Sequence, residues 1–190
     1  MRRALVLLVL LLAVLAAAPA GAGRPAADRP IEDYAPYQPQ TRCSPHAKPG
    51  AVALGRFLVQ RYGGALGAIS RACSRTATSE HAEGRAVDWS LSATTPAGRR
   101  TARAFLRAAF ATDRAGNPDA LARRMGIMYV IWDDEIYSAW NGFEPERYLS
   151  SSCRRVRRCS PTLRHRDHVH VSITRAAARA RTSWFAGRVS

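Results

Sequence analysis

Two stretches decide the fold: SEHAEGRAVDWSL at residues 79–91 and HVHVSIT at residues 168–174. Each contains an alternation of apolar and polar residues, which is the two-residue period of a β-strand with one buried face. In the first stretch Asp88 falls on the polar face of the strand, and in the second His168 and His170 share the face opposite the valines. The apolar faces predict a common core, and the polar faces leave one carboxylate and two imidazoles to a cleft.

Helical and extended patterns alternate along the rest of the chain. We expect helices, from the spacing of apolar residues or from composition, at 50–62, 97–112, 117–125 and in the Arg/Ala-rich segment before Trp184. We expect further strands at 67–71 and 127–132, and irregular structure at 133–165. Separated strands and helices of this kind predict a single α+β domain, with a small, mostly antiparallel sheet flanked by helices.

The composition is that of a folded, strongly basic chain. It has 190 residues, 47% of them apolar, and a formal net charge of +15 at pH 7. The apolar fraction excludes an intrinsically disordered chain, and the length suits one domain with a real core. Lys48 is the one lysine, so arginine supplies almost all of the positive charge. Such a charge is typical either of a solvated basic surface or of attraction to a polyanion.

The N-terminus predicts export. Arg2 and Arg3 precede an apolar run that ends in small residues, which is the pattern of a secretory signal peptide. We therefore predict a signal peptide at 1–22, a proline-rich linker at 23–40 and the folded domain at 41–190. An uncleaved membrane anchor is the alternative, and no later segment is apolar enough to span a membrane. Export makes nucleic acid an unexpected partner and favours an anionic cell-wall polymer.

Four cysteines fit an exported protein, because disulfides persist in oxidising compartments. They allow three pairings, of which proximity in sequence favours Cys43–Cys73 and Cys153–Cys159. Closure of the longer loop would stabilise the fold by about 3–4 kcal/mol in the chain-entropy model. A zinc site made of these four residues is not expected, because no CxxC spacing is present.

The histidines and acidic residues of the two stretches predict a metal site. His168 and His170 can approach one metal ion together, or one can bind it while the other does acid–base work. With Asp88, and with the His81 loop that Gly84 lets approach, they offer the three ligands that with water make a catalytic Zn²⁺ site. The zinc helix motif HExxH is absent. The remaining histidines, His46 and His165, are expected to be exposed outside this site, and Glu83 is expected to be solvated.

The same stretches resemble a known group of enzymes. Residues 79–88 match S-x-H-x-x-G-x-A-x-D at every fixed position, which resembles the zinc signature of D-alanyl-D-alanine carboxypeptidases. The H-x-H at 168–170 resembles the terminal motif of the superfamily that joins these enzymes to lysostaphin-type endopeptidases and hedgehog domains. Together with the stretches at 43–45 and 124–132, they look like a branch of secreted actinobacterial domains. The resemblance covers residues 40–186 and implies a hedgehog/DD-peptidase-like fold.

By this resemblance His81, Asp88 and His170 are the ligands of one Zn²⁺ ion. The general base is either His168, as in the lysostaphin-like branch, or Asp167, which stands where the carboxypeptidases have a glutamate; His168 is favoured. Asp167 could instead orient an imidazole. Arg71, shortly before the motif, could bind a substrate carboxylate or the oxyanion.

The resulting functional hypothesis is a secreted, monomeric zinc metallopeptidase that acts on peptidoglycan stem peptides, as a carboxypeptidase or an endopeptidase. The competing hypothesis is a non-catalytic, metal-containing module of the same fold that binds the cell wall; the aspartate at position 167 motivates it. A third hypothesis is polyanion binding by arginine alone, with affinity that falls steeply with salt.

Overall fold

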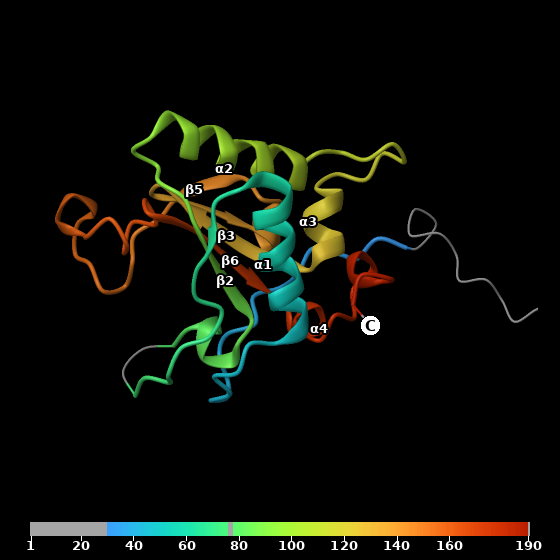
Figure 1. Cartoon of the computed structure of the whole chain (residues 1–190), viewed down its shortest axis with the longest axis horizontal. Helices are drawn as coiled ribbons and strands as arrows, with labels where there is room; N and C mark the ends of the chain where they lie inside the picture. Colours follow the sequence, from blue (N-terminus) through green and yellow to red (C-terminus); the bar gives the residue numbers. More distant parts are fainter. Residues whose placement is uncertain (1–29, 76–77, 190) are drawn as a thin grey trace, which may run out of the picture.

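Six strands form one antiparallel sheet in the spatial order β1–β2–β6–β3–β4–β5 (Figure 1). The strands are β1 (Ala65–Leu66), β2 (Ala86–Ser90), β3 (Ile127–Trp132), β4 (Glu135–Ser138), β5 (Pro145–Arg147) and β6 (His168–Ile173). The structure is a computed structural model and describes residues 30–75 and 78–189. The signal peptide predicted at 1–22, and residues 23–29, lie outside the described residues.

Four α-helices accompany the sheet, so the predicted α+β class is confirmed. They are α1 (Pro49–Tyr62), α2 (Pro96–Ala109), α3 (Ala120–Met125) and α4 (Arg175–Ala178). Local sequence explains the ends of the two long helices. Both have proline in the first turn, where its missing N–H costs nothing. The Thr95 hydroxyl caps α2 by accepting from the Gly98 N–H at 3.1 Å, and Gly63, with φ 86°, ends α1.

The helices α1 and α2 lie next to each other and pack on one face of the sheet (Figure 1). The register explains how this face becomes apolar. Val171 of β6 lies between Val87 of β2 and Val130 of β3, and all three side chains are fully buried. The next residue position along each strand points to the opposite face, where Asp88 pairs with His170. The alternation in the sequence therefore separates a hydrophobic core from a polar sheet face.

Residues 30–40, part of the predicted proline-rich linker, contain no helix or strand but pack against the domain. The Glu32 carboxylate accepts hydrogen bonds from the N–H and hydroxyl of Ser183, and the Tyr34 hydroxyl donates to Asp119. Both cystine bridges favoured by sequence proximity are present. Cys43–Cys73 ties the segment that precedes α1 to the loop before residue 80, and Cys153–Cys159 closes a short loop.

Three details of the sequence-based assignment are wrong. The short strand expected at 67–71 is β1, two residues earlier. The region 133–165 contains strands β4 and β5, and a turn at Asp133 and Asp134, with φ 49° and 69°, joins β3 to β4 in a hairpin. Left-handed residues at both turn positions suit a hairpin, but Asp-Asp is not a strong hairpin signal. The third helix begins at Ala120 rather than at 117, because the Asn117 side chain donates to Asp113 instead of capping.

Within residues 30–75 and 78–189, no helix combines the length and the apolar character that a bilayer crossing requires.

A buried ion pair holds the corner where β2 begins. Arg85 is 1% exposed, and its Nε donates to the Glu83 carboxylate at 2.6 Å. The same guanidinium donates to the Ile173 carbonyl at 3.0 Å and to the Gln38 carbonyl. The Glu83 carboxylate also accepts from the backbone N–H groups of Thr41 and Arg42. The expectation that Glu83 is solvated is therefore wrong: it is buried and joins the segment before α1 to the sheet.

Replacement of Glu83 by Gln should lower the free energy of unfolding at pH 7 by about 3 kcal/mol, because it removes the nearer of the two carboxylates that face the buried Arg85 and leaves only Glu80, 3.8 Å away. Burial opposes ionisation of Glu83, but hydrogen bonds from Thr41 and Arg85 outweigh it and lower its pKa from 4.5 to about 2. A carboxyl group with a depressed pKa stabilises the fold above about pH 4.5 and loses this contribution as the pH falls through 2. Denaturant unfolding between pH 7 and pH 2 should therefore show the parent and Glu83→Gln converging in acid.

The matched control is Glu146→Gln on the exposed strand β5, which should change the stability by less than about 0.5 kcal/mol. Equal, pH-independent effects of the two substitutions would contradict the role given to the Glu83–Arg85 pair.

Candidate metal centre

Three ligand-type atoms converge on the polar face of the sheet. Asp88 Oδ1 lies 3.0 Å from His81 Nε2 and 3.1 Å from His170 Nδ1, and the two nitrogens are 3.2 Å apart. The three side chains come from positions up to 89 residues apart in the sequence. Among the described residues, they form the group of histidine and acidic side chains that could hold a metal ion.

His81 is positioned by a short 3₁₀ turn, Glu80–Glu83, directly before β2. Gly84 ends this turn with φ 65°, and a Cβ built there would lie 1.9 Å from the His46 carbonyl oxygen. Glycine is therefore required both by the backbone conformation and by the close approach of the preceding loop. The Nδ1 of His81 lies 3.1 Å from the Ile69 carbonyl. Because a carbonyl can only accept, Nδ1 carries a proton, and Nε2 is the nitrogen directed at the centre as the candidate ligand atom.

Asp88 and His170 are brought together by strand pairing, since they are direct partners in the β2–β6 register. His170 Nε2 lies 2.8 Å from the Ser172 hydroxyl, which leaves Nδ1 directed at Asp88. Burial lowers the pKa of His170 and favours its neutral, metal-binding form. Burial by itself would raise the pKa of Asp88, but hydrogen bonds with His170 and His81 outweigh it and hold that pKa well below its usual range.

The donor set fits a tetrahedral metal ion with an open position. Two ligand atoms bound to such an ion at about 2.0–2.1 Å are about 3.3 Å apart. The three observed separations, 3.0–3.2 Å, are close to this value. Two imidazole nitrogens and one carboxylate oxygen are a ligand set found in catalytic zinc sites, and they also accept other divalent ions. The site can therefore hold a metal ion.

The two residues expected to act as the base lie at the edge of this group. His168 Nε2 is 3.6 Å from Asp88 Oδ1, and its Nδ1 is 2.7 Å from Asp167 Oδ1. The other oxygen of Asp167 accepts from the Thr162 hydroxyl at 2.5 Å. Burial opposes ionisation of Asp167, but hydrogen bonds from Thr162 and His168 lower its pKa. Asp167 is thus an ionised acceptor for the His168 ring, and the second nitrogen of that ring faces the three-residue group.

Arg71 lies in the loop that precedes the 3₁₀ turn, and its side chain is exposed. Its backbone N–H donates to the His81 carbonyl at 3.1 Å. The backbone of Arg71 therefore helps to fix the loop that carries His81. Within the described residues, the Arg71 side chain makes no contact with the three ligand-type atoms.

Sequence reasoning missed His165, which it predicts to be exposed and outside the site. The structure places this ring half-buried, with its centroid 4.7 Å from that of His168 and 5.6 Å from that of His170. Burial, followed by the proximity of His170 and His168, lowers the pKa of His165 to about 3. The ring reaches the site because residue 165 adopts φ 50°, a left-handed conformation that strand and helix periodicity does not predict.

Aromatic rings extend the site across the neighbouring strand. The Tyr129 ring stacks on His170 at 5.6 Å between centroids, and its hydroxyl donates to the buried Glu80 at 2.6 Å. Tyr37 and Trp140 pack beside Tyr129 and on each other, yet are 52% and 48% exposed. An exposed aromatic surface therefore adjoins the group of metal-binding side chains.

The fold and the site together define an α+β domain with a His–Asp–His group able to hold a metal ion. Comparison with family models then identifies the family: the chain belongs to the family described as VldE, C-terminal domain, whose model matches residues 43–155. The matched segment includes His81 and Asp88 and ends before β6, which carries His170. The comparisons with curated proteins and with solved structures return no match.

Removal of one ligand-type side chain should abolish stabilisation by metal. A divalent ion at about 1,000 times its dissociation constant stabilises a folded protein by about 4 kcal/mol, which raises the melting temperature by several degrees. Zn²⁺ should produce such a shift in the parent, and His81→Ala and Asp88→Asn should show none. His46→Ala removes an exposed histidine and should keep the full shift. An unchanged shift in both ligand variants would show that Zn²⁺ binds elsewhere.

Proposed function

We propose that this protein is a secreted zinc metallopeptidase that hydrolyses peptidoglycan stem peptides, as a carboxypeptidase or an endopeptidase. The observation that carries the proposal is the convergence of His81, Asp88 and His170, with His168 beside them on the polar sheet face. Zinc is proposed because two imidazoles and a carboxylate with an open position form a catalytic zinc site. The two disulfides are consistent with an extracellular location.

The chain's own residues suggest how the reaction would proceed. When bound, the metal ion would supply Lewis acidity toward the scissile amide carbonyl and toward water. His168 would accept a proton from the attacking water and deliver it to the leaving amine, so that the amide C–N bond breaks to an acid and an amine. Asp167 would hold the His168 ring through Nδ1 and stabilise its protonated form. Arg71 would bind a carboxylate of the substrate from its exposed position.

The aromatic surface supports a substrate larger than a single amino acid. Tyr37 and Trp140 are exposed next to Tyr129, which contacts His170. Exposed aromatic side chains beside a reactive group provide apolar contact area for a bound chain. A peptide branch of the cell wall is a substrate of this kind, and the positive charge of the protein would favour association with an anionic wall.

The His168 and Asp167 variants separate the two candidate bases. With zinc-loaded protein and purified muropeptides, His168→Ala should lower kcat by at least about a hundredfold, because general-base catalysis contributes about 10²–10⁴-fold. Asp167→Asn should lower kcat by about 10–100-fold, since it keeps the shape but removes the charge that orients the ring. Both variants should keep the zinc-induced rise in melting temperature.

The reverse order of effects would assign the base to Asp167. Release of no amino acid and no peptide by the zinc-loaded parent would contradict the peptidase proposal. Retained binding to isolated cell walls in that case would favour the non-catalytic wall-binding module.

A further inference from the structure

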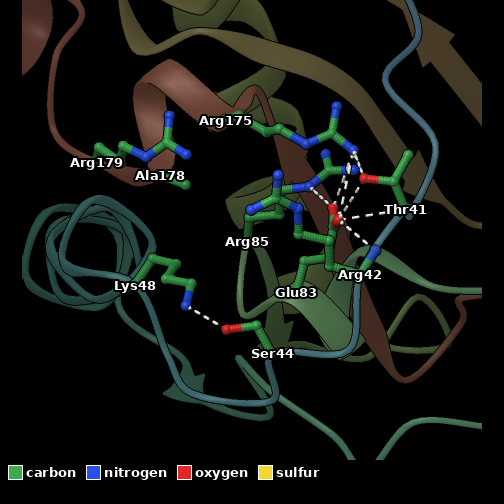
Figure 2. Close-up of a pocket in the computed structure, with 9 residues that line it drawn as sticks. All are labelled: Thr41, Arg42, Ser44, Lys48, Glu83, Arg85, Arg175, Ala178 and Arg179. Atoms are coloured by element: carbon green, nitrogen blue, oxygen red, sulfur yellow. Dashed lines mark hydrogen bonds and ion pairs between the residues drawn. The ribbon is translucent and has the colours of Figure 1, made fainter.

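A polar cavity, separate from the His–Asp–His group, is lined mainly by cationic side chains. It has a volume of about 490 Å³ and lies between the segment before α1, the corner of β2 and helix α4 (Figure 2). Its charged lining consists of Arg42, Lys48, Arg85, Arg175, Arg179 and Glu83. Five cationic groups thus face one carboxylate, and they come from three segments that are distant in the sequence.

The single carboxylate of the cavity, Glu83, already accepts hydrogen bonds from other groups of the protein. Glu83 is 6% exposed and accepts from the backbone N–H groups of Thr41 and Arg42 and from the side chains of Arg85 and Arg175. Its charge is matched by the buried Arg85 at 2.6 Å. Glu83 therefore balances the buried arginine and part of Arg175, and the positive charge of the other lining residues is left without a matching carboxylate.

Lys48 and Arg179 carry this excess charge into the cavity. Lys48 is half-buried, and its ammonium donates to the neutral hydroxyl of Ser44 at 2.7 Å. Arg179 follows α4, with an exposed side chain, and Figure 2 shows it on the opposite side of the cavity from Glu83 and Thr41. Like charges held around one space repel each other, so an anion bound between them would relieve this repulsion.

We propose that this cavity binds a phosphate group. A planar carboxylate is satisfied by one arginine fork, whereas the tetrahedral oxygens of phosphate accept from several directions at once. The N–H groups of Lys48 and of the lining arginines come from separate segments and approach from different directions, which suits a tetrahedral ligand. The ammonium of Lys48 acts as a point charge. The volume exceeds that of a single ion, so the phosphate can belong to a small monoester or to a phosphodiester polymer. This binding does not depend on the metal centre or on the proposed peptidase activity.

A calorimetric titration of the whole protein with inorganic phosphate, at constant ionic strength, measures the dissociation constant and tests the proposal. The parent should bind phosphate saturably and acetate much more weakly. Lys48→Gln and Arg179→Gln should each weaken phosphate binding about tenfold, because each removes one charge-assisted contact. Both side chains lie outside the hydrophobic core, so the melting temperatures should stay close to that of the parent.

The matched control removes two arginines from another surface. Arg100→Gln combined with Arg107→Gln changes the net charge by two on the exposed side of α2, which lies at the other end of the domain from α4 (Figure 1). Phosphate affinity in this control should stay within twofold of the parent, whereas Lys48→Gln combined with Arg179→Gln should lose about a hundredfold. Equal losses in the two double variants would overturn the proposal, because they would show binding to overall charge.

Two further measurements complete the test. Phosphate affinity should be unchanged after treatment with a chelator, and its loss would overturn the proposal by showing that phosphate binds a metal ion. Glycerol 1-phosphate and poly(glycerol phosphate) then distinguish the two sources of the group: tighter binding of the first supports a monoester ligand, and tighter binding of the second supports a polymer. Failure of the parent to bind any of the three phosphates more tightly than acetate would overturn the proposal.

Discussion

The pairing register of β2 with β6 is the constraint on which the site depends. Asp88 lies opposite His170 only in this register, and the same pairing buries Val87 against Val171. A shift by one residue would turn the valines to the polar face and carry the carboxylate into the core. The hydrophobic effect therefore selects the register, and the metal-binding geometry follows from it. The same β2–β6 pairing thus places the hydrophobic core on one face of the sheet and the candidate centre on the other.

The turn at residues 80–85 lies between two sites of opposite charge preference. His81 and its partners form a compact group of two imidazoles and one carboxylate, which suits a cation. Glu83 and Arg85, only two to four residues further on, form a buried pair within a cationic cavity, which suits an anion. The short turn directs His81 to the first environment and Glu83 to the second, so one segment contributes to both proposed sites.

Much of the fold could be predicted from the sequence, because strong periodicity survives in the long elements. Two long helices and one central strand have ends that lie no more than three residues from the expected ones: 49–62, 96–109 and 127–132. Sequence patterns do not predict strands β4 and β5, because both are short, all residues of β5 are exposed, and the turn that leads from β3 into β4 uses two aspartates in left-handed conformations. Short exposed elements bury too little apolar surface to leave a pattern.

For this protein the sequence by itself determined the α+β class and the residue types of the candidate centre, and it favoured one of three disulfide pairings, because each depends on local spacing or composition. Only the tertiary structure decided which nitrogen of each histidine faces Asp88, that His165 turns back toward His168, and that Glu83 is buried. It also brought Lys48 and Arg179 to one cavity. These features depend on contacts between segments distant along the chain, and no local pattern of residues encodes where such segments meet.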